Sequence, residues 1–187
     1  KALVFLPMAI SFVGAAVIWR FIYYRALYGQ QIGLLNAIVT ALGGEPVGWL
    51  RTEPWNNFFL IIIMIWLQTG FAMVILSAAL RGIPEETVEA AIVDGAGPFT
   101  IFFKIKVPQI MSTIVVVWTT ITILVLKVFD IVYTMTGGNF GTEILPSYMM
   151  TFMFRDDGRA TAVAFVIMLV VLPVMIWNIR QARAEMR

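Results

Sequence analysis

Acidic side chains gather in one polar stretch that separates two strongly apolar segments of the chain. Glu85, Glu86, Glu89 and Asp94 lie within the sequence IPEETVEAAIVDGAG, residues 83–97. The chain contains no His and no Cys, so the commonest metal ligand, the commonest general base and thiolate chemistry are all missing. Zinc chemistry and Cys-His or Ser-His catalysis are therefore excluded.

The polar stretch predicts a helix, a turn and a second helix. Pro84 suits the first helical position, and the helix is expected to run to about Asp94. Gly95 then supplies the left-handed residue that ends it. A second short helix is predicted over 98–106, and Pro108 is expected to begin the next apolar segment.

On the first of these helices, apolar and acidic side chains fall on different faces. Helical spacing groups Val88, Ala91 and Ile92 on one face and Glu85, Glu86 and Glu89 on another. Like charges at these spacings repel by roughly 0.2 to 0.5 kcal/mol per pair. An acidic face kept despite this repulsion indicates a positively charged partner, and the alternative is a solvated linker helix.

The composition places this stretch between membrane spans. Apolar residues make up 60% of the 187 residues and charged residues 13%, with a mean hydropathy of +0.90. Soluble domains are about half apolar and a quarter charged, whereas a spanning helix needs about 20 apolar residues. We therefore predict an all-α, polytopic transmembrane helical bundle. Its four spans are expected over about 2–22, 58–80, 110–134 (Ile110 to Leu126 with a continuation toward Thr136) and 160–179.

The connections between the spans differ in character. Residues 23–57 are rich in turn formers and are expected to form an ordered aqueous loop. Within 137–159, the apolar piece 144–154 is too short to span and is predicted to be re-entrant or interfacial. Lys and Arg divide almost evenly between the two sides, but they occupy shorter loops on the side of 81–107 and of both ends. That side is expected to be cytoplasmic.

A few polar residues interrupt the predicted spans. Lys127 and Asp130 lie one helical turn apart and either pair beside a water-filled path or reach out to the interface. Gln68 and Thr69 stand beside Gly70, where small and polar residues serve either helix packing or a solute path.

The polar stretch resembles the cytoplasmic "EAA" loop with which permeases of ABC importers dock onto their ATPases. The matching positions are Glu89, Ala90, Ala91, Asp94, Gly95, Ala96, Phe102, Ile105 and Pro108. The segments LPMAISFVGAAVIWRFIY, PWNNFFLIIIMIW, LKVFDIVYTMTGG and LPVMIWNIR extend the likeness to permeases of the maltose and alpha-glucoside type. Ile92 departs from the pattern, since many sugar permeases have a basic residue there.

This resemblance implies a fold, partners and a location. The type I importer permease core has about five helices, so the first is expected to precede Lys1, where the chain begins without Met. The implied partners are a second homologous permease, an ATPase dimer that binds ATP and Mg, an extracytoplasmic solute-binding protein and a sugar. The implied location is the bacterial inner membrane. The chain has no Walker A sequence, so no cofactor of its own is expected, and a net charge of +2 does not suggest nucleic acid.

The resemblance also implies a solute path through the second and third spans. Carried over, its positions are Met64, Leu67, Gln68, Phe71, Thr120, Ile123, Leu124 and Lys127, to which the charge argument adds Asp130. Several of these are apolar, which leaves open a site in the partner permease. Downstream, Asn139-Phe140-Gly141 replaces the usual Gly and Pro after TMTGG, which suggests a different solute.

Other functions remain open at this stage. An ABC permease for a non-sugar solute would carry the same docking loop. An ion-coupled secondary transporter usually has broken helices or buried carboxylates at mid-membrane, and here the acid within a span is Asp130, near its end. A membrane enzyme is disfavoured because the chain has neither a GxSxG sequence nor His.

Overall fold

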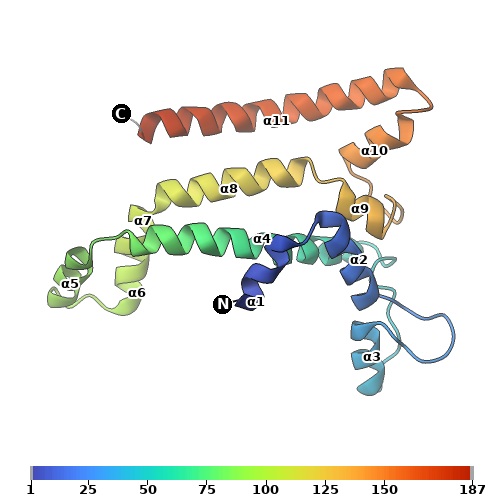
Figure 1. Cartoon of the computed structure of the whole chain (residues 1–187), viewed down its shortest axis with the longest axis horizontal. Coiled ribbons are helices and arrows are strands. Elements are labelled where there is room, and N and C mark those ends of the chain that lie inside the picture. The colour runs from blue at the N-terminus through green and yellow to red at the C-terminus, as the bar shows by residue number, and fades with distance from the viewer. Residues whose placement is uncertain (1, 186–187) are drawn as a thin grey trace.

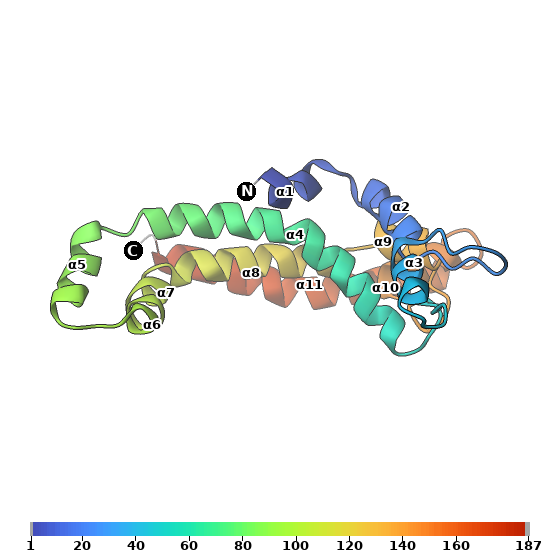
Figure 2. The same cartoon turned by 90° about the horizontal axis from the view of Figure 1, so that it is seen from below.

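Three long helices run side by side along the molecule. The computed structural model describes residues 2–185, and every regular element within them is a helix. Helix α8 (Met111–Leu126) packs between α4 (Trp55–Arg81) and α11 (Asp157–Glu185), as Figures 1 and 2 show. By length and composition, α4 and α11 can cross a membrane, and α8 joins them as a third when it is taken with the bent helix before it.

Helices α4 and α11 cover the second and fourth predicted spans, 58–80 and 160–179, and extend beyond them. Pro54 precedes the first turn of α4 and Gly82 follows its last residue, in keeping with the preference for Pro before helices and Gly after them. Helix α11 contains Pro173 and keeps its apolar face largely exposed, as a helix in contact with lipid would.

The first predicted span, 2–22, is not one helix, so that prediction was wrong. It divides into α1 (Ala2–Phe5), a 3₁₀ turn η1 (Leu6–Ala9) and α2 (Phe12–Ile22). Pro7 lacks the N–H that a continuing helix needs. Ser11 is extended, and its hydroxyl accepts a hydrogen bond from the Gly14 amide at 3.1 Å. This N-cap starts a new helix in a different direction.

The third predicted span is also shorter than expected at both ends. Pro108 lies inside α7 (Val107–Gln109), and α8 begins after Ile110. Helix α8 ends at Leu126, so the expected continuation to Thr136 is instead a separate helix, α9 (Asp130–Met135). Gly137, with φ +64°, stops α9 and donates its amide to the carbonyls of Val132 and Tyr133.

Two shorter helices lie in the connections. The predicted loop 23–57 contains α3 (Leu34–Ala41), which sequence reasoning missed. The apolar piece 144–154 forms α10 (Leu145–Phe152), which packs against α11. Both helices lie at the same end of the molecule, opposite the end that carries α5 (Glu85–Val93) and α6 (Pro98–Thr100) (Figure 1).

The hydrophobic core lies where α2, α4 and α9 meet. Its buried members are Ala15, Ala16, Tyr23, Leu60, Ile63, Leu67, Ile131, Val132 and Met135. Tyr23 satisfies its hydroxyl within this core by donating to the Phe59 carbonyl at 3.0 Å. Trp19, Trp49 and Trp66 pack around it with tilted and edge-on ring contacts. The core therefore fixes the broken first segment against α4.

Candidate functional site

The polar stretch forms a helical hairpin beyond the ends of α4 and α8 (Figure 2). Helix α5 begins at Glu85, with Pro84 as its N-cap rather than its first residue, and ends at Val93 with Asp94 as its C-cap. The second helix does run from Pro98, but it becomes a π-helix, η2 (Ile101–Lys106), and continues through α7. It then meets α8 at an angle of 69°.

The turn after α5 explains the Asp94-Gly95-Ala96 sequence. Gly95 has φ +78°, and its amide donates to the Ile92 carbonyl at 2.9 Å. The Ala96 amide donates to the Ala91 carbonyl, also at 2.9 Å. These two bonds form a Schellman motif, which fixes the direction of the chain after the helix. Ala91, 7% exposed, packs inside the hairpin.

The outer surface of the hairpin is acidic and apolar. Glu85, Glu86, Glu89 and Asp94 are exposed. The exposed apolar side chains are Ile92, Val93, Phe99, Phe102 and Phe103, with Val93 at 86% and Phe99 at 82%. Ile92 was expected to share the inner face with Ala91, but it is exposed. Charged side chains beside uncovered aromatic rings are typical of a surface that another protein covers.

The remaining positions of the predicted loop differ in burial. Ala90 and Pro108 are exposed, Ala96 and Ile105 are half-buried, and Ile101, outside the predicted set, is buried. Phe102 packs edge-on against Phe103, with ring centroids 4.9 Å apart. The hairpin therefore has a small internal packing contact, and most of its apolar surface faces outward.

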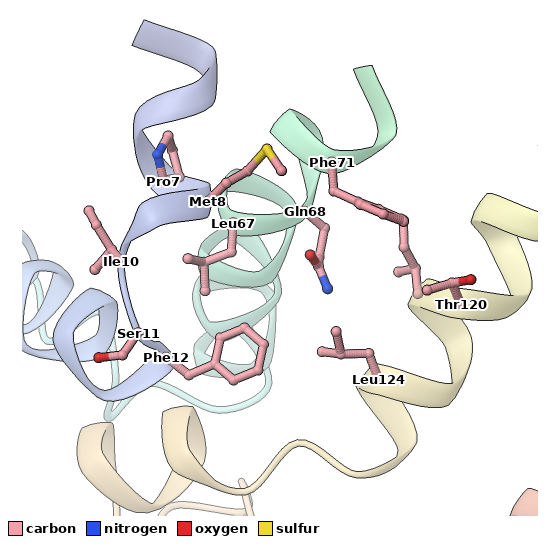
Figure 3. A pocket seen from close by; sticks show the side chains of 11 residues that line it. Pro7, Met8, Ile10, Ser11, Phe12, Leu67, Gln68, Phe71, Thr120 and Leu124 are labelled. Carbon is pink, nitrogen blue, oxygen red and sulfur yellow. The ribbon is translucent and has the colours of Figure 1, made fainter. Parts of the chain in front are cut away.

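A cavity of about 410 Å³ lies between η1, the start of α2, α4 and α8 (Figure 3). It brings together five of the predicted path residues, which are Leu67, Gln68, Phe71, Thr120 and Leu124. Met64 lines a different cavity, of about 260 Å³, near α9. Ile123, Lys127 and Asp130 line neither of these two cavities.

Sequence reasoning missed one wall of the cavity. The break in the first segment contributes five lining residues, Pro7, Met8, Ile10, Ser11 and Phe12, and of these the side chains of Met8 and Phe12 point toward α4 and α8 (Figure 3). The signal that was available is Pro7 followed by Ser11, a helix stop and an N-cap within an otherwise apolar run.

Gln68 supplies the main uncommitted polar group of this cavity. Its side-chain nitrogen is buried and has no hydrogen-bond partner within the described residues, and its amide points into the space (Figure 3). The Thr120 hydroxyl, by contrast, donates to the Val116 carbonyl at 2.8 Å. A buried amide without a partner costs free energy until a ligand or water accepts its hydrogen. The cavity therefore favours an uncharged ligand with hydroxyl or carbonyl oxygens and apolar faces.

The predicted pairing of Lys127 with Asp130 is absent. Lys127 is the exposed C-cap of α8, and Asp130 is the half-buried first residue of α9, where a negative charge suits the helix dipole. Among the side chains that the structure describes (residues 4–177, 179 and 180), the ion pair present is Arg159–Asp156 at 3.0 Å. No cluster of metal-ligating side chains occurs in that range either.

Long apolar helices, a hairpin at one end and an internal cavity between the helices together fit the class of polytopic helical membrane proteins. Residues 2–184 match the family described as the inner membrane component of binding-protein-dependent transport systems. The chain belongs to this family.

Individual members of the family resemble the chain over nearly its whole length. The chain is 67% identical to the alpha-glucoside transport system permease protein of Rhizobium meliloti over 99% of its length, and it spans 56% of that relative. It is 59% identical to the osmoprotective compounds uptake permease protein of Synechocystis, again over 99% of its length, and spans 67% of it. The trehalose/maltose permease of Thermococcus litoralis is 33% identical over 98% of the chain, which covers 61% of that protein.

Solved structures agree with the fold. A chain in the crystal structure of a bacterial alginate ABC transporter, complexed with an alginate pentasaccharide-bound periplasmic protein, superposes with a TM-score of 0.83. The match covers 98% of this chain and 64% of the other, at 23% sequence identity. The architecture is thus that of an ABC transporter permease, as the sequence predicted.

Proposed function

We propose that this chain is the permease subunit of an ATP-driven importer for a sugar or oligosaccharide of the alpha-glucoside class. The observation that carries the proposal is the hairpin of residues 84–109, which holds uncovered acidic and aromatic side chains beyond the ends of the apolar helices. The 67% identity to an alpha-glucoside permease supports the class of solute.

In this proposal the hairpin is a cytoplasmic coupling element that seats in an ATPase subunit. Glu89 and Asp94 offer carboxylates to positive groups of that partner, and Phe102 offers an exposed aromatic ring. Ala90 and Ala96 have small side chains that let another protein approach the hairpin closely, and Ala91 packs inside it. Gly95 fixes the turn after α5, and Pro108 lies in α7 just before the bend at Ile110. ATP and Mg are bound and hydrolysed by the partner, so this chain is a transport component rather than an enzyme.

The coupling element acts as a rigid segment. The Schellman bonds at Gly95 and Ala96 hold α5 to the turn after it. When the two ATPase subunits close on ATP, α5 and the helix that follows move with them, and this displacement tilts α4 and α8. The cavity then changes from open toward the cytoplasm to open toward the binding protein outside.

The cavity lined by Leu67, Gln68, Phe71, Thr120 and Leu124 is the proposed solute path in this subunit. The Gln68 amide donates to a sugar hydroxyl, and Phe71 presents an apolar ring to the apolar face of a sugar. Four further residues do not line this cavity, and we propose that they reach the solute path only in other conformations of the transporter: Met64, Ile123, Lys127 and Asp130. A second homologous permease supplies the opposite wall.

Uptake by the intact transporter tests the proposal. The full-length chain is reconstituted in liposomes with its second permease, ATPase and binding protein, and uptake of maltose or trehalose is measured with ATP inside. Uptake that requires ATP and persists with an ionophore supports the importer. Uptake that stops with the ionophore while ATP remains favours an ion-coupled transporter instead.

Glu89→Lys tests the role of the hairpin in the same system. This variant is expected to lose coupled uptake and to release the ATPase during purification, because it reverses a charge on the docking surface. Glu143→Lys, at an exposed acid near the opposite end of the molecule, is the matched control. Equal uptake by the Glu89→Lys variant and the unaltered chain would contradict the proposed docking role.

A further inference from the structure

A smaller pocket, of about 300 Å³, lies at the end of the molecule opposite the hairpin. It is bounded by the last turn of α2, the loops on either side of α3, and α9 with the turn that follows it (Figures 1 and 2). Three arginines, Arg20, Arg25 and Arg51, line it together with Trp49 and Phe140. The proposed transport mechanism does not use this pocket.

The positive charge of this pocket is not compensated within the described part of the chain. Arg20, Arg25 and Arg51 make no ion pair with any described side chain, since the pair present among those side chains is Arg159–Asp156. The carboxylate of Glu53 lies against Gly141, just past Phe140, and is not paired with any of the three arginines. Three like charges lining one pocket repel one another, so an anion bound there would be strongly favoured.

The other polar groups that line the pocket either have an unpaired hydrogen-bond donor or already make hydrogen bonds within the protein. The indole nitrogen of Trp49 is buried and has no hydrogen-bond partner. Arg51 stacks over the Phe140 ring at 5.8 Å, which orients its guanidinium. The Tyr23 hydroxyl is already used by the Phe59 carbonyl, and the Thr136 hydroxyl by Val132 and Thr142. Forked guanidinium donors with an unpaired indole N–H suit a ligand that only accepts hydrogen bonds, such as an oxyanion.

The apolar part of the pocket narrows the class of ligand. Leu27, Leu50 and Met135 line it beside the arginines, and Leu27 and Tyr24 also expose apolar surface at its rim. Arginines next to exposed Leu and Tyr, at one end of a bundle of apolar helices, are suited to a phosphate group that carries hydrocarbon. We propose that this pocket binds a phosphate group through Arg20, Arg25 and Arg51, and that its source is an anionic phospholipid of the adjacent leaflet.

Binding to the purified full-length transporter in neutral detergent tests this proposal. One arm titrates phosphatidylglycerol against phosphatidylcholine and counts bound lipid by native mass spectrometry. A second arm titrates inorganic phosphate and measures its binding by calorimetry. The variant is Arg25→Gln, because Arg25 lies in a loop and makes no ion pair or ring contact that its loss would break. The matched control is Arg155→Gln, an exposed arginine at the same end of the molecule.

The expected result is that the unaltered transporter retains phosphatidylglycerol in preference to phosphatidylcholine. The affinity for phosphatidylglycerol should fall about tenfold in Arg25→Gln, because one charge-assisted hydrogen bond is lost, and should not change in Arg155→Gln. Arg25→Lys is expected to fall between the two, since lysine keeps the charge without the fork. If the transporter binds inorganic phosphate saturably but shows no preference between the two lipids, the pocket binds phosphate, and its ligand is free phosphate and not a phospholipid. Equal effects of Arg25→Gln and Arg155→Gln on phosphatidylglycerol binding, with unchanged thermal unfolding, would overturn the proposal. Arg20→Gln, in helix α2, provides a second variant for the same measurement.

Discussion

The backbone of Gly70 in α4 lies directly against Val4 in α1. A Cβ atom placed on Gly70 would lie 2.7 Å from the Val4 carbonyl oxygen and 2.8 Å from the Met8 side chain. Real Cβ contacts are never so short, so only glycine permits this approach. Because Met8 also lines the cavity beside Leu67 and Gln68, this contact fixes one wall of the proposed solute path.

Gly70→Ala is therefore expected to lower the stability of the purified transporter by about 1–3 kcal/mol, the usual cost of overpacking. The added methyl group must displace the backbone of α1 at Val4 as well as the flexible Met8 side chain. Thermal unfolding in detergent measures the effect. Gly82→Ala is the control from the C-cap of the same helix, where the nearest atom is an ordinary 3.4 Å away. Equal unfolding temperatures for the two variants would show that α1 does not pack there.

Gly95→Ala tests the turn of the hairpin. Gly95 has φ +78° with open space around it, so its substitution strains the backbone by roughly 1–2 kcal/mol without any clash. The expected result is a hairpin that docks poorly, seen as a lower fraction of ATPase retained on the purified permease. Gly97→Ala, with negative φ and equally open space, is expected to retain the ATPase. If both variants lose the ATPase, the added methyl groups disturb the docking surface itself, and the conformation of the turn is not the cause.

Gln68→Leu tests the cavity. Removal of the buried, unpaired amide is expected to raise the apparent KM for the solute roughly threefold to tenfold, the worth of one neutral hydrogen bond. Solute-stimulated ATP hydrolysis by the full transporter gives this value. Thr69→Val is the neighbouring control, because its hydroxyl donates to the Ile65 carbonyl and does not line the cavity. If Gln68→Leu leaves the KM unchanged, Gln68 does not contact the solute, and the polar contact is instead expected in the partner permease.

Asn36→Ala tests the loop that carries Arg25. Asn36 is fully buried, donates to the Tyr24 and Val47 carbonyls at 3.0 Å, and accepts from the Val47 amide at 2.9 Å. Its loss leaves these backbone groups unpaired and is expected to destabilise residues 24–47 by roughly 1–3 kcal/mol. Hydrogen exchange should become faster in that range alone. Asn57→Ala, at an exposed asparagine of α4, is expected to leave exchange there unchanged.

Elements with clear stop and start residues were predictable from the sequence. Helix α5 lies between Pro84 and Gly95, the residues from which its limits were predicted, whereas α4 was predicted from hydropathy over 58–80 and extends from Trp55 to Arg81. The all-α fold and the family followed from composition and from the matched loop. Five of the residues predicted for the solute path, on α4 and α8, line one cavity, and their contact with a solute stays a prediction.

The break in the first segment was not predicted, for a physical reason. Pro7 and Ser11 interrupt a run whose average hydropathy stays high, and hydropathy reports solvent preference rather than hydrogen-bonding direction. The separation of α9 from α8 is similar, because Val128 and Phe129 are apolar although the chain is not helical there. Pro7 and Ser11 mark the break, but the packing of residues 7–12 against α4 and α8 as a cavity wall depends on tertiary structure, which the local sequence does not report.

The segment Pro98–Gln109 meets α8 at an angle of 69°. In the proposed mechanism, a displacement of the hairpin along this segment would therefore reach α8 more as sideways motion of its end than as sliding along its axis. Such a motion would change the width of the space beside α8 more than the depth of its side chains along the helix axis.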